Sequence, residues 1–189
     1  AIQEFRSLQN RPADFRALVD TAFGTHFVYF REPGYDSGIP NGVISRFPIL
    51  ASGTWPSGVN NRGFAWARLD VPGTNELVAV SIHFKAGSSD AGTRSTQASD
   101  LRSRIQSSFP AAEFLVVAGD FNLQSRSETA LATLKTFLSD DPIPTDAEAG
   151  GHPNTDEDHK RPYDLVLPNA AFRAHFAPLA LGARTFPHG

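Results

Sequence analysis

Apolar residues recur along the chain in two patterns, as short continuous runs and at helical spacing, and the two patterns alternate. The continuous runs predict strands at residues 26–30, 43–45, 64–69, 77–82, 114–118 and 163–167. The runs at 77–82 and 114–118 are almost wholly apolar, which is typical of strands covered on both faces. Strands of that kind lie inside a sheet that packs against helices or against a second sheet.

Helical spacing of apolar residues separates several of these runs. A first helix is expected to begin after Asn10, which can cap its N-terminus, and to continue through Ala22 with Pro12 in its first turn. A second helix is expected at 93–107, where Leu101 is one of the few apolar residues and arginine is frequent. That composition predicts a helix on the surface of the molecule.

The third expected helix follows Ser125 and Glu128, whose spacing is that of a capping box, and continues through Phe137. Stretches rich in glycine and proline at 33–42 and 139–159 are expected to be loops, and a loop as long as the second usually has a function or is disordered. Because strands and helices alternate without an internal repeat, the pattern predicts a single domain over residues 1–189, of the α/β or α+β class.

The composition fits a folded domain and excludes several classes of protein. Hydrophobic residues make up 40% of the chain, and the mean hydropathy is -0.26. No run approaches the ~20 apolar residues that span a bilayer, so no stable membrane insertion is expected. The chain has no cysteine, which excludes disulfides, thiolate zinc sites and a catalytic cysteine.

The net charge and the first residue leave open whether the chain binds nucleic acid and whether it is a processed protein or a fragment. The net charge of -3 argues against binding nucleic acid through bulk positive charge, but a nuclease with a local basic groove is compatible with it. The chain starts at Ala1 rather than at methionine, as expected of either a processed, exported protein or an internal fragment. The oligomeric state stays open.

Polar side chains with chemical potential stand at the ends of the two most apolar strands. Asp120 and Asn122 follow one of them, and their spacing places both side chains on one side of an extended chain. A carboxylate and an amide together can hold a hard cation, a water and a phosphate oxygen, although the same residue types also form turns. His83 ends the other strand, with Lys85 just after it. A histidine there can act as an acid, as a base or as a hydrogen-bond donor to phosphate, or it can be a structural residue.

Three further residues complete the candidate set. Asp164 lies within an apolar run, where a carboxylate is costly unless it is paired, and Arg161 is its candidate structural partner. Glu4 and Arg62 are, taken singly, ordinary surface charges. Taken together, oxygen ligands with a single histidine and no cysteine suit Mg²⁺, Mn²⁺ or Ca²⁺ better than zinc.

These motifs resemble, in the same order, those of the endonuclease/exonuclease/phosphatase superfamily, which has the fold of pancreatic deoxyribonuclease. The resembling segments are Gln3-Glu4, residues 42–49, Arg62, residues 81–85, the Gly-Asp-Phe-Asn tetrapeptide at 119–122 and residues 161–167. The resemblance covers nearly the whole chain. It implies an α+β fold, a four-layer sandwich of two mixed β-sheets flanked by helices, and a divalent-metal-dependent phosphoesterase, that is, a hydrolase acting on ester bonds.

The resemblance also implies a role for each candidate in catalysis. Glu4 would bind the metal, either Mg²⁺ or Mn²⁺/Ca²⁺. Asp120 would orient or deprotonate the attacking water, and His83 and Asn122 would hold the phosphate oxygens and stabilise the charge on phosphorus.

Substrate binding and the ends of the domain follow from the same resemblance. Arg62 and Lys85 would bind substrate, and Asp164 would orient a histidine on the family's final strand. That strand is not visible before Gly189, and the family's first strand is not visible before Glu4. We therefore expect the domain to be incomplete at both ends and the natural protein to continue with a histidine-bearing strand. The strand of Asp164 should then form an open sheet edge or be covered by another segment.

Nucleic acid is the expected substrate, because Arg94, Arg102 and Arg104 could follow a phosphate backbone. One alternative is a lipid phosphodiesterase or a phosphatase of the same fold. A sphingomyelinase-like enzyme would carry exposed aromatic loops, whereas Trp55 and Trp66 are the only tryptophans and Trp66 is expected to be buried. Another alternative is a non-catalytic binding domain on this scaffold.

Overall fold

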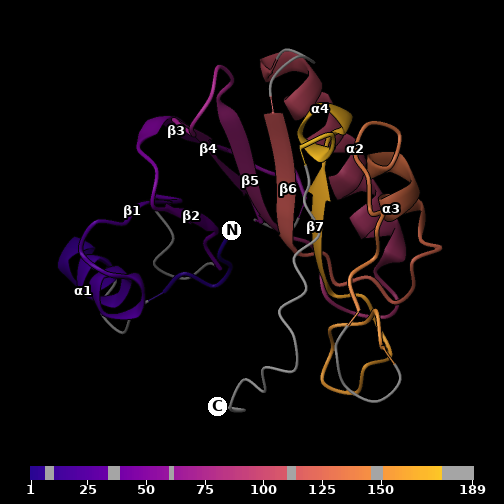
Figure 1. The fold of residues 1–189 in the computed structure, drawn as a ribbon. Helices are drawn as coiled ribbons and strands as arrows, with labels where there is room; N and C mark the ends of the chain where they lie inside the picture. Colours follow the sequence, from indigo (N-terminus) through magenta and orange to yellow (C-terminus); the bar gives the residue numbers. More distant parts are fainter. Residues whose placement is uncertain (7–10, 34–38, 60–61, 110–113, 146–150, 176–189) are drawn as a thin grey trace.

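The chain folds into two β-sheets with helices on their outer faces (Figure 1). The computed structural model describes residues 1–6, 11–33, 39–59, 62–109, 114–145 and 151–175. Their helices and strands are, in order, α1 (Pro12–Phe23), β1 (Val28–Arg31), β2 (Gly42–Ser45), β3 (Ile49–Trp55), β4 (Phe64–Leu69), β5 (Leu77–His83), α2 (Ala91–Ser108), β6 (Phe114–Asp120), α3 (Thr129–Leu134), β7 (Asp164–Pro168) and α4 (Ala170–Arg173).

The larger sheet has the strand order β3-β4-β5-β6-β7. β5 and β6 are parallel and are connected by α2, whereas the other neighbours are antiparallel. In the smaller sheet β1 pairs with β2, and an isolated bridge between Ile2 and Gly42 extends this pairing to the N-terminal segment. The expected α+β sandwich is confirmed, but the smaller sheet, as far as the chain is described, is antiparallel rather than mixed.

Apolar contacts join the elements into four layers. The largest cluster lies between the five-stranded sheet and α2 and α3. Val43 of β2 packs with Leu69 and Ala79 between the two sheets. Phe15 and Val19 of α1 pack on the far side of the smaller sheet. Each fully buried side chain of this kind contributes about 1.5–3 kcal/mol relative to an exposed one, so the two sheets and their helices are held as one unit.

The first helix starts one residue later than a cap at Asn10 would place it, and Asn10 itself lies outside the described residues. Arg11 occupies the N-cap position of α1. Its backbone N–H and its guanidinium both donate to the carboxylate of Asp14, at 3.3 and 2.9 Å. An acidic residue in the first turn therefore takes up an amide that would otherwise lack a partner.

α2 is confirmed as a helix, but it is less exposed than its sequence indicates. The side of α2 that faces the sheet carries Arg94, Gln97, Ala98, Leu101 and Ile105, all of them buried. Two polar side chains interrupt the apolar positions in this stripe. The sequence therefore underestimates how much of the helix is covered.

α3 begins and ends at other residues than expected, running over Thr129–Leu134 rather than through Phe137. Its predicted capping box does not form. The carboxylate of Glu128 accepts hydrogen bonds from Arg94, at 2.8 and 2.7 Å, in place of a reciprocal bond with Ser125.

The strand β3 was not predicted from the sequence. It alternates half-buried and exposed residues, and small residues replace the usual large apolar ones. Gly53 lies opposite Trp66, and a Cβ atom at position 53 would lie 2.7 Å from the indole ring. The strand is therefore shaped by the tryptophan that packs over it.

β7 is the outer strand of the sheet, which was one of the two expected arrangements. Within the described residues, β6 is its one partner strand. The expectation that the Asp164 run is buried was wrong, since the side chains of Asp164 and Val166 are exposed and those of Leu165 and Leu167 are buried. The strand has one covered and one open face, which is usual for an antiparallel edge strand.

Replacing Gly119 by alanine should destabilise the fold. Gly119 has a φ of +146°, and a Cβ there would lie 2.1 Å from the carbonyl oxygen of Ile82 and 2.8 Å from Nε2 of Gln3. We expect Gly119→Ala to lower the free energy of unfolding by at least about 1–3 kcal/mol, measured by urea denaturation. Gly92→Ala is the control, because a Cβ there meets nothing within 4 Å. Equal stabilities of the two variants would contradict the prediction.

Candidate active site

Three polar residues lie side by side at one end of the larger sheet. The strand register pairs His83 of β5 with Asp120 of β6, and Asp120 with Asp164 of β7. His83 is buried, and its Nε2 lies 3.3 Å from Oδ2 of Asp120. Because β7 is antiparallel to β6, its first residue lies opposite the last residue of β6, which in turn lies opposite the last residue of β5. The structure thus brings together three residues that the sequence placed on separate strands.

The chain turns sharply directly after Asp120. Asn122 has a φ of +50° and is buried, and its backbone N–H donates to Oδ1 of Asp120 at 2.8 Å. The side-chain amide of Asn122 donates to the carbonyl oxygen of Phe84 at 3.1 Å. The tetrapeptide is therefore a turn, as its composition allows, and the turn also fixes the Asp120 carboxylate: one oxygen accepts from Asn122, and the other faces His83.

Arg62 converges on the same backbone group. Its Nη1 also donates to the carbonyl oxygen of Phe84. Burial lowers the pKa of the Arg62 guanidinium below its usual value, while the negative charges of Asp120 and Glu4 act in the opposite direction. Both carboxylates are thus close enough to Arg62 to interact with it, which places Glu4 at this site.

The N-terminal segment is fastened to the sheet beside this site. Gln3 donates to the hydroxyl of Ser81 at 2.9 Å, and that hydroxyl donates to the carbonyl oxygen of Ile2 at 2.9 Å. Glu4 follows with a φ of +54°, an uncommon conformation for a residue other than glycine, and its side chain is exposed. Strained backbone that is held on both sides is common at functional sites.

The residues present fit a hydrated Mg²⁺ better than an ion enclosed by protein. Among the residues that the structure describes, no group of three or more His, Asp or Glu side chains converges as a metal site. Mg²⁺ needs no such group, because it usually keeps several waters and binds through one or two carboxylates and the substrate phosphates. The exposed carboxylate of Glu4, near Arg62 and Asp120, meets that requirement.

Asp164 does not pair with Arg161, its candidate structural partner. The guanidinium of Arg161 donates to the hydroxyl of Tyr163. The backbone N–H of Asp164 donates to the hydroxyl of Thr155 at 2.7 Å. Partial burial raises the pKa of the Asp164 carboxyl although its side chain retains exposed surface, and the charge of Asp120 raises it further, while Thr155 and His83 lower it. The charges of Asp120 and His83 thus act on the Asp164 carboxyl, as expected from the strand register that places it beside Asp120.

The loops after β5 and β6 are joined by a buried ion pair that the sequence did not reveal. Arg94 is fully buried and forms a two-pronged pair with Glu128. Its Nη1 also donates to the carbonyl oxygens of Lys85, at 3.1 Å, and Gly87, at 2.7 Å. Glu128 in turn accepts from the N–H of Gln124 at 2.7 Å. Lys85 is thus held by its backbone, and its side chain is half-buried.

The proposed arginine track along α2 is not supported. Arg94 is committed to Glu128 and cannot contact a phosphate backbone. Arg102 and Arg104 lie roughly 15–20 Å along the helix axis from the first turn of α2, because each residue advances ~1.5 Å. That first turn follows the end of β5 where His83 lies, so the two arginines are on the part of α2 that runs away from the site.

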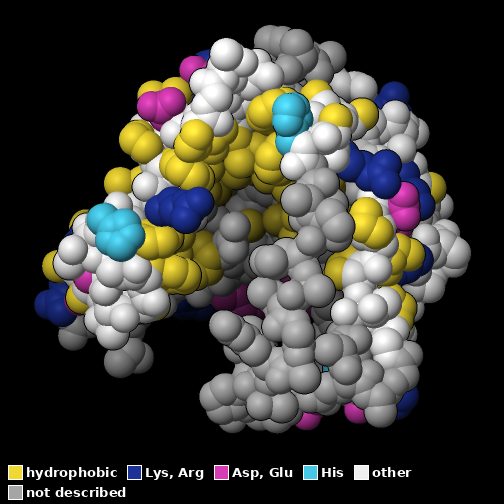
Figure 2. Space-filling view, viewed as in Figure 1, with side chains coloured by type: hydrophobic (Ala, Val, Ile, Leu, Met, Phe, Trp, Pro, Cys, Tyr) yellow, Lys and Arg dark blue, Asp and Glu magenta, His cyan; other side chains and the backbone are white. Residues whose placement is uncertain are grey.

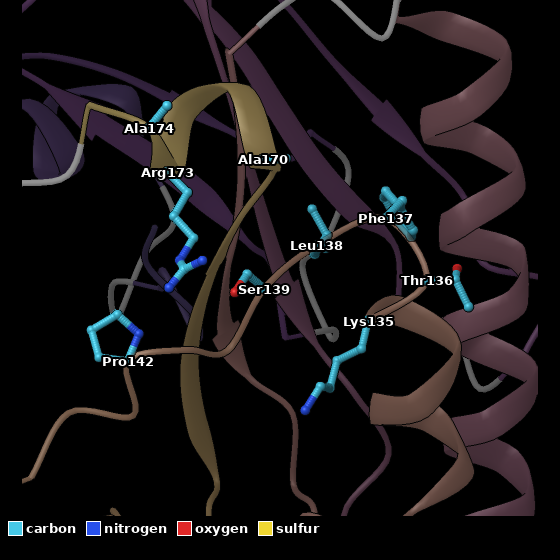
Figure 3. A pocket seen from close by; sticks show the side chains of 9 residues that line it. All are labelled: Lys135, Thr136, Phe137, Leu138, Ser139, Pro142, Ala170, Arg173 and Ala174. Carbon is cyan, nitrogen blue, oxygen red and sulfur yellow. The ribbon is translucent and has the colours of Figure 1, made fainter.

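A cavity of about 510 Å³ opens beside Asp164, and Gln3, Gly119 and Thr155 are among its lining residues. Figure 2 shows the face seen in Figure 1, where hydrophobic side chains border a hollow. A second cavity, of about 590 Å³, lies between α4 and the chain that follows α3 (Figure 3). Its Lys135 and Arg173 are paired with Asp140 and Asp141. None of the row residues lines this second cavity, so it is not the candidate active site.

The family whose sequence model matches this chain consists of hydrolases that act on phosphoester bonds. The chain belongs to the Endonuclease/Exonuclease/phosphatase family, whose sequence model matches residues 1–181. The superfamily inferred from the order of the motifs is thereby confirmed. No curated protein sequence matches the chain.

Several solved structures share this fold with the chain. Humanized TDP2 of D. rerio superposes with a TM-score of 0.61 at 16% identity, over 87% of this chain and 68% of that one. Sphingomyelinase C of Streptomyces griseocarneus gives 0.59 at 19%, over 84% and 66%. The catalytic domain of human Nocturnin gives 0.59 at 17%, over 82% and 64%. The chain thus spans about two thirds of the length of these structures, and the likeness shows the fold alone.

The described helices include none that is both long and apolar enough to cross a membrane.

Acid should remove the contribution of Glu128 to stability. Burial acts to raise the pKa of its carboxyl, but the hydrogen bonds from Arg94 and Gln124 and the charge of Arg94 outweigh it, so the pKa lies below the usual 4.5. A carboxyl whose pKa is lowered on folding stabilises the fold above its unfolded pKa, and this is lost as the pH falls through the folded pKa. We expect Glu128→Gln to cost about 3–5 kcal/mol at pH 7, because Arg94 is left buried and unpaired.

The measurement is urea denaturation of wild type and Glu128→Gln between pH 7 and pH 3, where the difference should shrink with acidification. Asp158→Asn is the matched control, since its pair with Lys160 is exposed. Removing an exposed pair should cost about 1 kcal/mol or less. A difference between wild type and Glu128→Gln that does not depend on pH would contradict the prediction.

Proposed function

We propose that the chain hydrolyses phosphodiester bonds of nucleic acid in a reaction that depends on a divalent metal. The observation that carries the proposal is the row of His83, Asp120 and Asp164 at the ends of three neighbouring strands. An oriented carboxylate beside an imidazole is suited to activate a water, and the arginine next to it is suited to a phosphate.

Asp120 is the group proposed to act on water. Its two oxygens are constrained by the N–H of Asn122 and by the imidazole of His83. A carboxylate held in this way accepts the proton of the attacking water without first having to reorient. A bound metal, with Glu4 as its protein ligand, would supply positive charge that neutralises the phosphate and the leaving oxygen.

The residues proposed to donate hydrogen bonds to the phosphate are Asn122, Arg62 and His83, with Lys85 nearby. One hydrogen of the Asn122 amide is used by the carbonyl oxygen of Phe84, which leaves the second for a substrate oxygen. The planar fork of Arg62 likewise carries more N–H donors than the one used by that carbonyl. Donors fixed before substrate binds stabilise charge that develops on phosphorus. Asp164, which lies near His83, would contribute negative charge to the row.

The preference for nucleic acid over lipid is part of the proposal. Trp55 is buried, and its ring packs 5.6 Å from that of Phe109. Trp66 packs against the same ring at 5.3 Å. Neither tryptophan is therefore an exposed aromatic of the kind that enters a membrane. One of the structures with this fold is D. rerio TDP2 complexed with single-strand DNA product, and we transfer that substrate class to this chain.

The test is turnover of matched substrates with excess Mg²⁺ or with EDTA. Single-stranded DNA, single-stranded RNA, sphingomyelin vesicles and p-nitrophenyl phosphate cover the competing substrate classes. We expect cleavage of a single-stranded nucleic acid with Mg²⁺ and none with EDTA. Cleavage of sphingomyelin alone would make the chain a lipid phosphodiesterase. Binding of nucleic acid without turnover would support a non-catalytic domain.

Replacing Asp120 by asparagine should remove the acceptor of the water proton while keeping the shape of the side chain. The expected loss of kcat is ~10²–10⁴-fold, the usual contribution of a general base. Asp100→Asn on α2 is the control, because that carboxylate pairs with Arg104 on the helix. Near-normal turnover by Asp120→Asn would exclude the proposed role.

Replacing Glu4 by glutamine should weaken the dependence on metal by orders of magnitude and leave the metal-free melting temperature nearly unchanged, because the side chain is exposed. The measurement is a Mg²⁺ titration of activity, together with a thermal melt in EDTA. Glu157→Gln is a suitable control at another exposed glutamate. Coincident titration curves for wild type and Glu4→Gln would show that Glu4 is not the ligand.

A further inference from the structure

Glu32 is a buried carboxylate that takes no part in the row. It follows β1 directly, and 1% of its surface is exposed. Its Oε2 accepts a hydrogen bond from the backbone N–H of Asn41 at 2.7 Å, and its own N–H donates to the carbonyl oxygen of Asn41 at 3.0 Å. Burial raises the pKa of Glu32, and the bonds with Asn41 and the charge of Arg31 only partly offset this. So deep a carboxylate is costly, and the hydrogen bond that Oε2 accepts from Asn41 offsets part of that cost, whereas Oε1 is buried without a hydrogen-bond partner.

The side chain of Asn41 extends this contact toward Arg62. Asn41 is fully buried, and its Nδ2 donates to the carbonyl oxygen of Gly63 at 2.9 Å. Gly63 is the residue directly after Arg62. The bond therefore fixes the backbone from which the Arg62 side chain reaches Phe84.

The residues on either side of Asn41 extend the contact toward Glu4. The N–H of Phe5 donates to the carbonyl oxygen of Pro40 at 2.9 Å, and Ile2 and Gly42 exchange two backbone hydrogen bonds of 2.9 and 2.8 Å. Glu4 lies between Ile2 and Phe5, with its backbone in the left-handed region. Bonds on both sides of Glu4 thus depend on the place of residues 40–42.

We propose that Glu32 is a positioning residue that holds Asn41 and thereby sets the places of Glu4 and Arg62 together. The roles of Glu4 as metal ligand and of Arg62 in binding phosphate rest on the proposed function. Glu4 comes from the N-terminal segment and Arg62 from the chain before β4, and the segment of residues 40–42 forms hydrogen bonds with both of these parts of the chain. Loss of the Glu32 carboxylate should therefore loosen both Glu4, the candidate metal ligand, and Arg62, the candidate phosphate-binding residue.

Glu32→Leu tests the proposal by removing the acceptor while nearly conserving volume, and Glu32→Gln restores an acceptor oxygen. Two readouts do not require turnover: amide hydrogen exchange of Ile2, Phe5 and Gly42, and Mg²⁺ affinity measured by calorimetry. In Glu32→Leu we expect these amides to exchange faster than global unfolding predicts, and Mg²⁺ affinity to fall about 10–100-fold, as when a group supporting a metal ligand is lost. Glu32→Gln should recover most of both.

Two further variants separate positioning from stability. Ile105→Ala removes buried volume from the cluster between α2 and the larger sheet, which contains none of Ile2, Phe5 and Gly42, so it should lower stability and leave both readouts unchanged relative to global unfolding. Asn41→Ala removes the bond to Gly63 but keeps the Asn41 backbone N–H. It should raise KM for the cleaved substrate, with little change in Mg²⁺ affinity, and it serves as the test where Glu32→Leu does not fold.

Two results would overturn the proposal: Glu32→Leu behaving like Ile105→Ala in both readouts, or Asn41→Ala leaving KM unchanged in a protein that cleaves its substrate. Failure of the proposed function looks different. A wild-type protein that binds no Mg²⁺ and cleaves no phosphoester would refute that function, and amide exchange would still decide whether Glu32 holds the N-terminal segment.

Discussion

The geometry of the candidate active site depends on one buried ion pair, Arg94 with Glu128. Arg94 stands in the first turn of α2, and its planar fork reaches Glu128 with two nitrogens and the loop after β5 with a third. Glu128 in turn orders the loop after β6. Because both loops follow the strands that carry His83 and Asp120, a single interaction fixes the exits of both parallel strands. An apolar pair of equal volume would fill the space but supply none of these directed bonds.

Shared acceptors connect the rest of the site. The carbonyl oxygen of Phe84 accepts from both Arg62 and Asn122, and the carboxylate of Asp120 faces both Asn122 and His83. No candidate residue is placed by its own strand alone. Networks of this kind are stiff when every member is satisfied, and they transmit a fault in one member to its neighbours. The shared acceptors explain how residue types that are common on protein surfaces are held here in one defined arrangement.

The sequence predicts those features that depend on neighbouring residues along the chain. The continuous apolar runs of β5 and β6 placed both strands closely, and His83 and Asp120 followed as their last residues. It does not predict features that depend on a distant partner. Gly53 of β3 lies against Trp66, Arg94 is buried where it pairs with Glu128, and Glu32 is buried where it accepts a hydrogen bond from Asn41. The run at Asp164 misled for a related reason: Val166 is apolar, yet it is exposed on an edge strand.

The bond between Gln3 and Ser81 has a consequence for the order in which the molecule assembles. It joins residues 78 positions apart, and the row adds Asp164 beside Asp120. Closing such long loops costs entropy before any contact repays it, so pairings of this kind form late. On the ribosome, Gln3 emerges before Ser81 and has to wait for β5, and the row is complete only after β7 has left the exit tunnel. The row of His83, Asp120 and Asp164 therefore cannot form in a growing chain that still lacks β7.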